Sequence, residues 1–191
     1  MNSFYDGLIK LIISLSTGVL GIIPGIDGHD AQFTESEFYV RNNEIFISAL
    51  IESNFNQRID DIIRSGRRVR LHITAEIYRE QDKKPLKKAA LIKTVDYDIL
   101  EKHYLLSYEN TEEFVIYEEK AAMWQNFLTI KDRPVFRAKD FPDKGPYHIQ
   151  VRAELETDLE ISGKNLDLML FWNNKAPEFT TSAFDNSIFS M

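Results

Sequence analysis

The most constraining feature of the sequence is a strict alternation of apolar and polar residues from residue 68 to residue 77. Apolar side chains stand at every second position from Val69 to Ile77, with arginine, histidine, threonine or glutamate between them. Successive side chains of a strand point to opposite faces of its sheet. The spacing therefore predicts a strand with one buried and one solvated face, as in an antiparallel sheet that packs one face on a core.

Further apolar runs separated by short polar breaks predict more strands. Asn42 and Asn43 separate the first two runs, and because asparagine tolerates positive φ, we expect a tight hairpin there. The predicted strands besides that of residues 69–77 are Glu37–Val40, Glu44–Ile51, Ala89–Ile99, Lys102–Tyr108, Glu113–Tyr117, Tyr147–Glu156 and Leu166–Trp172.

Two segments show helical spacing instead. In the first, Asn54–Ser65, isoleucines recur at positions that share one helix face, Asn54 is a suitable N-cap and Gly66 follows the last turn. In the second, Glu118–Leu128, two glutamates stand in the first turn, where the helix dipole favours negative charge.

The order of predicted elements is β-β-α-β-β-β-β-α-β-β. Neighbouring strands with short connections favour antiparallel pairing, so we expect an α+β, mainly β fold: a β-sandwich or a curled sheet with two packed helices. Residues 132–146, which contain three prolines, are expected to form a loop. The predicted organisation is a signal segment over 1–31, one β-rich domain over 32–175 and a tail or loosely docked segment over 176–191.

The N-terminal segment has no charge between Leu11 and Ile26, a length typical of the apolar region of a secretory signal. Pro24 would break a helix where a cleavage region begins, and Gly28 and Ala31 are candidate residues before the cut. An uncleaved membrane anchor and a buried helix of the domain remain alternatives. A cleaved signal predicts an exported protein of the periplasm or envelope.

Composition limits the possible partners and chemistry. The formal net charge is −7, which gives no general attraction to nucleic acid or to anionic lipid. The chain has no cysteine, which excludes disulfides, thiol catalysis, zinc–thiolate sites and a lipoprotein anchor. Contact with a membrane is therefore expected only through the N-terminal segment, if that segment is not removed.

The order of several segments resembles that of a known family. These segments are the Ala49-Leu50 pair, residues 56–71, Tyr104-Leu105-Leu106, residues 118–128 and residues 147–153. That family is an uncharacterised bacterial domain-of-unknown-function family of short exported proteins, sometimes labelled proline-rich signal peptide proteins. The resemblance covers roughly Glu37–Trp172, although this chain lacks the proline-rich character of that label. It implies an envelope or periplasmic location and transfers no activity and no catalytic residue.

Four arginines crowd one predicted helix–strand junction: Arg64, Arg67, Arg68 and Arg70. Guanidinium groups bind carboxylate and phosphate through paired hydrogen bonds, so this cluster is a candidate anion or partner contact. A solvated strand face, with Arg64 favourably placed at a helix C-terminus, is the alternative interpretation.

Other potentially reactive residues form no recognised motif. The four histidines lack metal-binding spacing, and adjacent carboxylates such as Asp60 and Asp61 point in different directions on a helix. The aromatic residues between 104 and 127 are expected to form core. We therefore expect no cofactor, no metal and no catalytic site.

These observations predict an exported, non-catalytic binding or adaptor domain whose partner is an envelope protein. A carrier or sensor for an apolar small ligand, held between the sheet and the helices, is the alternative.

Overall fold

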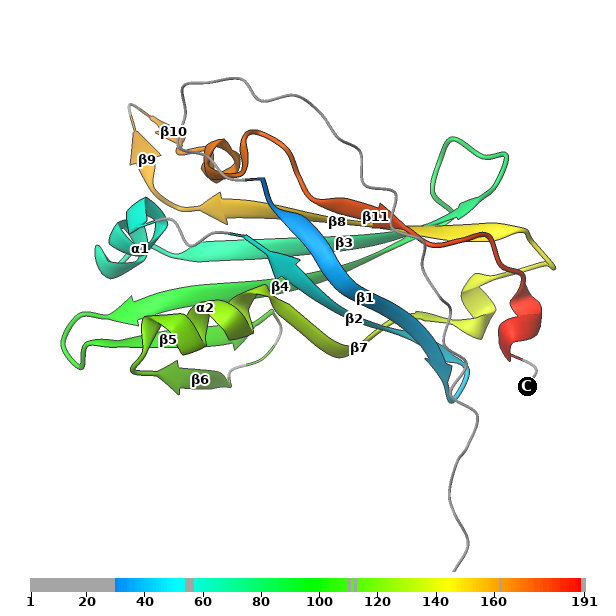
Figure 1. The fold of residues 1–191 in the computed structure, drawn as a ribbon, viewed down its shortest axis with the longest axis horizontal. Helices are drawn as coiled ribbons and strands as arrows, with labels where there is room; N and C mark the ends of the chain where they lie inside the picture. The colour runs from blue at the N-terminus through cyan, green and yellow to red at the C-terminus, as the bar shows by residue number, and fades with distance from the viewer. Residues whose placement is uncertain (1–29, 54–56, 110, 112, 162, 190–191) are drawn as a thin grey trace, which may run out of the picture.

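The computed structural model describes residues 30–53, 57–109, 111, 113–161 and 163–189. These residues form two main antiparallel sheets and one short hairpin (Figure 1). The larger sheet has six strands in the order β11-β8-β3-β4-β5-β6, and the smaller has three in the order β1-β2-β7. The strands are β1 Gln32–Arg41, β2 Glu44–Glu52, β3 Val69–Arg79, β4 Lys87–Asp98, β5 His103–Tyr108, β6 Phe114–Tyr117, β7 Thr129–Arg137, β8 Tyr147–Thr157, β9 Glu160–Ile161, β10 Lys164–Asn165 and β11 Glu178–Thr180.

The core lies between the two sheets. The smaller sheet crosses one face of the larger sheet (Figure 1), and we call that face the inner face. Alternate residues of β3 from Val69 to Ile77 are buried, as the alternation predicts. The sheets meet where the ring of Phe33 on β1 packs edge-on against Phe179 on β11, with 4.8 Å between ring centroids. A mainly β, α+β fold with antiparallel sheets is confirmed.

Two helices pack on the same inner face: α1, Gln57–Arg64, and α2, Lys120–Leu128. Ile59 and Ile63 of α1 are fully buried, as are Met123 and Phe127 of α2. Burial of one such side chain stabilises the fold by about 2–3 kcal/mol. Both predicted helices are confirmed, and the expected N-cap of the first lies outside the described residues. The second begins at Lys120, so Glu118 and Glu119 precede its first turn instead of standing in it.

The predicted hairpin between β1 and β2 is also confirmed. Asn42 and Asn43 have φ of 52° and 62°, and Arg41 pairs directly with Glu44. Two successive residues with positive φ define the turn whose twist matches that of the flanking strands.

The loop expected over residues 132–146 is wrong in its first part, because β7 extends to Arg137. Asp132 and Pro134 resemble strand breakers, yet both are accommodated. Asp132, with φ of 49°, lies where the register with β2 shifts, and it accepts hydrogen bonds from Tyr39 and Ser48. Pro134 is tolerated because β7 is the edge strand of its sheet, where one side of the backbone needs no ladder partner.

The strand expected over Leu166–Trp172 is also wrong. Residues Leu168–Trp172 form a 3-10 helix, η2, whose start is capped by the Asp167 carboxylate accepting from the amide of Met169. Leu168 and Trp172 are both buried, and the Trp172 indole donates to Ser53 Oγ at 3.0 Å. Both large side chains reach the core from this short helix.

The segment expected as a tail contributes to the domain. Its strand β11 pairs with β8, and Phe179 and Phe184 are buried. A further short helix, η3, spans Asn186–Phe189. Residues 1–29, which include the apolar run predicted as a signal, lie outside the described residues. Within the described part of the chain, no helix is long and apolar enough to cross a membrane.

Candidate interaction surface

Strand β6 forms one end of the six-stranded sheet. It pairs with β5 in a regular antiparallel register, from Tyr104 opposite Tyr117 to Ser107 opposite Phe114. No strand of the described residues pairs with its other side, and Figure 1 shows β6 at the border of the fold beneath α2. Backbone N–H and C=O groups of alternate β6 residues therefore face outward without a ladder partner.

Three consecutive apolar side chains of β6 are exposed. Phe114, Val115 and Ile116 keep 56%, 49% and 53% of their surface in solvent. The register places Phe114 and Ile116 on the outer face of the sheet, where the half-buried Leu105 of β5 lies opposite Ile116. Val115 lies opposite the buried Leu106 on the inner face and is exposed because no further strand covers it. We call Phe114, Val115 and Ile116, with the unpaired side of β6, the open edge.

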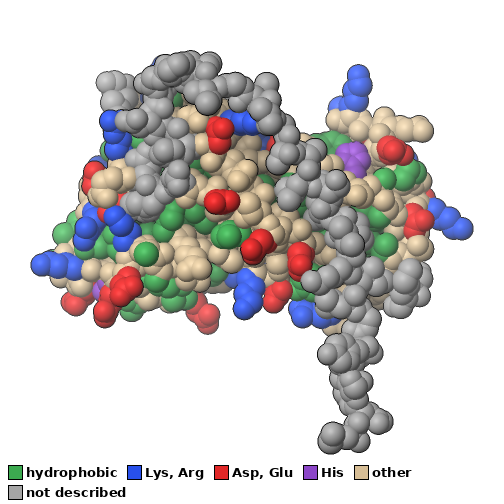
Figure 2. All heavy atoms as spheres, viewed as in Figure 1, with side chains coloured by type: hydrophobic (Ala, Val, Ile, Leu, Met, Phe, Trp, Pro, Cys, Tyr) green, Lys and Arg blue, Asp and Glu red, His purple; other side chains and the backbone are tan. Residues whose placement is uncertain are grey.

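Carboxylates stand at both ends of the open edge. Glu113 precedes it, and Glu118 and Glu119 follow Tyr117; all three glutamates are exposed. Among the described residues, none of these three carboxylates forms an ion pair. Asp and Glu side chains also gather along the lower border of the space-filling view, in the region where Figure 1 places β5, β6 and α2 (Figure 2).

A buried hydrogen-bond cluster fixes the two helices behind the open edge. Asp60 of α1 is fully buried and accepts from the Tyr104 hydroxyl at 2.7 Å. Its other oxygen accepts from Gln57 at 3.3 Å and lies 3.7 Å from the Lys120 ammonium on α2. Burial, together with the bond to Asp60, raises the pKa of Tyr104. This cluster joins α1, α2 and β5, the strand on which β6 rests.

A buried lysine provides a second support. Lys93 of β4 is fully buried on the inner face, and its ammonium donates to the carbonyls of Asn126 and, at 2.7 Å, Thr129. Both carbonyls belong to the C-terminal end of α2, where a cation is favourable. Burial and, secondarily, the charge of Arg133 lower the pKa of Lys93 from its ordinary value of 10.5 to about 7.

The four arginines singled out from the sequence do not converge on one point. Arg64 on α1 lies over the Tyr97 ring at 5.2 Å and donates to its hydroxyl, which raises the pKa of Arg64. Arg68 pairs with Asp96 at 2.9 Å, and Arg70 lies 3.5 Å from Glu156.

Arg67 is exposed. Arg68 and Arg70 therefore face carboxylates of neighbouring strands, and Arg64 stacks on an inner-face tyrosine. Contact of these four arginines with an anion or a partner stays a prediction.

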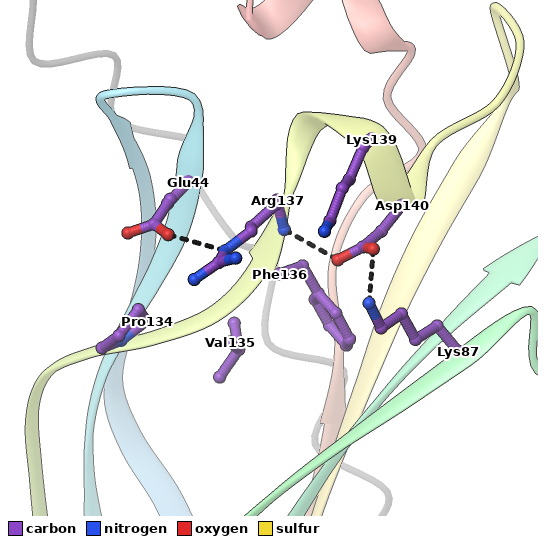
Figure 3. Close-up of a pocket in the computed structure, with 8 residues that line it drawn as sticks. All are labelled: Glu44, Lys87, Pro134, Val135, Phe136, Arg137, Lys139 and Asp140. Atoms are coloured by element: carbon purple, nitrogen blue, oxygen red, sulfur yellow. Dashed lines mark hydrogen bonds and ion pairs between the residues drawn. The ribbon is translucent and has the colours of Figure 1, made fainter.

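A polar cleft opens beside the smaller sheet, where β2 begins and β7 ends (Figure 3). It has a volume of about 330 Å³ and lies between β7, the short helix η1, Ala138–Asp140, and Lys87 of β4. Four of the charged groups around it are paired with one another: Arg137 bonds Glu44 at 2.9 Å, and Lys87 pairs with Asp140. Burial opposes ionisation of Asp140, but the Lys87 ammonium and the Arg137 amide lower its pKa below the ordinary value.

Two other hollows differ in character. A groove of about 380 Å³ on the outer face is lined by polar and charged side chains of β3, β4, β8 and β11. An apolar pocket between Phe38, Ile149, Phe184 and their neighbours has a volume of about 10 Å³. That space is close to the size of one water, so this pocket as it stands does not admit a larger apolar ligand. Across the described part of the chain, no group of three or more possible ligands could hold a metal ion.

The sequence pattern predicts β6 as a strand but does not predict its exposure. The aromatic residues of this region were expected in the core, and Tyr104, Trp124 and Phe127 are buried there. Phe114 is the exception. The available signal was a short run of four apolar residues without alternation, bounded by glutamates on both sides.

Comparison with curated proteins and with solved structures found no match to this chain. A family model described as "Domain of unknown function (DUF4390)" matches residues 29–169, which is most of the chain and nearly all of the described core. The resemblance noted from the sequence to a domain-of-unknown-function family is thereby confirmed, and the chain belongs to the DUF4390 family.

Proposed function

We propose that this chain is an exported, non-catalytic adaptor domain that binds an envelope protein by accepting an extended segment of it as an additional strand beside β6. The observation that carries the proposal is the open edge: three consecutive exposed apolar residues on a strand with one unpaired side. In this recognition mode, backbone hydrogen bonds supply affinity and alternate side chains supply selectivity. The proposal assigns the chain no cofactor and no catalytic residue.

The contrast between the two ends of the large sheet supports this choice of surface. Soluble proteins protect edge strands by making them short, by charged or proline residues, or by bulges. The opposite edge, β11, carries polar side chains outward: its exposed residues are Glu178 and Thr180. The open edge has no charge, no proline and no register shift. An edge of this kind is an aggregation hazard unless a partner covers it.

The support behind β6 favours a preformed site. Asp60 and Tyr104 connect α1 to β5, and Lys93 connects β4 to the end of α2. A rigid edge accepts a strand without ordering itself, so less binding free energy is lost on association. The alternative of a carrier for an apolar ligand gains no support from the apolar pocket described between Phe38, Ile149 and Phe184, which holds about 10 Å³.

Location in the envelope rests on the apolar run between Leu11 and Ile26, which lies outside the described residues. A signal of this type directs export through the inner membrane. The same segment, if retained, would tether the domain to that membrane and hold it beside other envelope proteins.

A matched pair of variants tests the proposed contact. Ile116→Lys places a charge in the open edge, and Leu170→Lys places one on η2, where Leu170 is also an exposed aliphatic residue. The Leu170→Lys variant should capture the same protein from the native envelope as the wild-type chain does. The Ile116→Lys variant should capture less of it, by on the order of tenfold or more. Equal capture by both variants would contradict the proposal. Thermal unfolding of both variants checks that each is folded.

A further inference from the structure

We infer that the open edge selects an extended partner segment that has apolar residues in its centre and lysine or arginine at both ends. The inference rests on the proposed function and adds the chemistry of the partner. Its basis is the combination of an apolar, unpaired strand with carboxylates beyond both of its ends.

The carboxylates at the two ends are available to a partner. Glu113 and Glu118 are exposed and stand immediately before Phe114 and after Tyr117. Among described residues neither forms an ion pair. The nearby Lys120 does not neutralise them, because it is engaged with Asp60 and with the Gln57 amide oxygen at 3.1 Å.

A strand added beside β6 would bring its ends close to these glutamates. Directly opposite residues on adjacent strands have Cβ atoms about 4.5–5.5 Å apart, and long side chains reach diagonal neighbours as well. A lysine or arginine at either end of the partner segment would therefore meet Glu113 or Glu118, and Glu119 lies one residue further. Acidic partner ends would meet the same carboxylates and be repelled.

The apolar centre of the segment follows from the exposed side chains. On the outer face the partner residues would lie beside Phe114 and Ile116, next to the half-buried Leu105. On the inner face they would lie beside Val115, at the border of the core. Apolar residues on both faces would remove this surface from water, which stabilises the complex roughly in proportion to the area covered.

The same charges disfavour a second copy of this chain as the occupant. In a symmetric antiparallel pair of β6 strands centred on Ile116, Ile116 would lie opposite its own counterpart and Val115 opposite Tyr117 of the other copy, because directly opposite residues share a face of the sheet. Glu113 would then lie directly opposite Glu119 at both ends of the pair. Like charges directly opposite are destabilising, so the acidic ends act against self-association through an edge that is otherwise apolar.

Selection from a display library of short random peptides tests the inference with defined probes. The purified wild-type chain is the bait, and the highest-affinity peptide is then synthesised with its terminal charges basic, neutral or acidic. We expect selected peptides with an apolar centre and basic ends. The basic form should bind on the order of tenfold more tightly than the acidic form at low salt, with a smaller ratio at high salt.

Two double variants with the same change in net charge locate the effect. Glu113→Gln with Glu118→Gln should reduce the preference for the basic peptide to within about twofold. Glu160→Gln with Glu178→Gln, which removes two exposed glutamates away from β6, should leave the preference unchanged.

The outcomes separate this inference from the proposed function. The selected peptides could bind wild type but not Ile116→Lys, and yet show no preference for terminal charge. That result would overturn the inference but would still support strand addition at β6. Failure to select any peptide whose binding depends on Ile116 would overturn both. Sedimentation showing a wild-type dimer that Ile116→Lys dissociates would overturn the inference by making a second copy the occupant.

Discussion

At the scale of single residues, Lys93 is the most unusual feature of the core. Its side chain is fully buried among the inner-face residues of β4. Its ammonium donates to two backbone carbonyls at the end of α2 and lies 5.4 Å from the centre of the Tyr108 ring. A buried ammonium without a carboxylate partner has a lowered pKa because burial disfavours the charged form. Lys93 therefore positions α2 and β7 and makes stability depend on pH.

The sign of that dependence follows from the two pKa values. The pKa of Lys93 is about 7 in the folded chain and near its ordinary value of 10.5 in the unfolded chain. Between these values the unfolded state binds more protons, so the free energy of unfolding should rise with pH, by at most about 1.4 kcal/mol per pH unit. We expect the stability of wild type relative to Lys93→Met to increase from pH 7 to pH 9 in urea unfolding. A constant difference over that interval would contradict the assignment.

The Asp60–Tyr104 hydrogen bond is the second residue-scale feature with a measurable consequence. Tyr104→Phe leaves one oxygen of the fully buried Asp60 carboxylate without its donor, and we expect a loss of about 1–3 kcal/mol in the free energy of unfolding. Tyr78→Phe is the control, because Tyr78 donates to Glu76 on the half-exposed outer face. It should cost about 0.5 kcal/mol or less. Equal losses in denaturant melts would contradict the structural role of the cluster.

At the scale of elements, the sequence predicts those strands, helices and turns whose conformation depends on residues close together in the chain. Three such predictions are confirmed: the strand β3 from its alternation, the helix α1 from its helical spacing, and the turn at Asn42–Asn43. The prediction of a loop failed at β7, because Asp132 is held by Tyr39 and Ser48, two residues far away in the sequence. The strand predicted at Leu166–Trp172 failed because the Asp167 cap and the packing of Trp172 on Ser53 override strand propensity.

The candidate site was only half visible in the sequence for the same reason. The composition of residues 114–117 indicates a strand, but whether a strand is central or at an edge depends on which strands pair with it. The local signal for the exposure of Phe114 is the pair of glutamates that bound its strand, and this signal does not show which strands pair with β6. The arginine cluster shows the converse: Arg68 and Arg70 look available in the sequence, and their partners Asp96 and Glu156 come from other strands.

The β1–β2 turn offers an element-scale prediction. Asn43 has φ of 62°, a region that glycine adopts without steric cost. Asn43→Gly should therefore leave the stability unchanged or raise it by up to about 1 kcal/mol, whereas Asn43→Ala should lower it by about 1 kcal/mol. Urea unfolding of both variants measures this contrast. If Asn43→Ala proves as stable as Asn43→Gly, the turn geometry described for Asn42 and Asn43 is wrong.

At the scale of the whole molecule, an apolar N-terminal run precedes a β-rich domain in which, among the described residues, β6 leaves one side of a sheet unpaired. Export predicts that the mature chain begins after Gly28 or Ala31, close to β1. N-terminal sequencing of protein from the native envelope fraction measures this directly. A chain that begins at Met1 would contradict cleavage and leave the alternative of a membrane anchor.

In the proposed function, β6 accepts a partner strand. Amide hydrogen exchange of the chain, alone and in complex with the partner recovered from the envelope, tests it most directly because it reports on backbone hydrogen bonds. We predict that the outward-facing amides of Phe114–Tyr117 exchange at least about tenfold more slowly in the complex, while those of β11 at the opposite edge are unchanged. Unchanged exchange in β6, with protection appearing on another surface, would contradict the account.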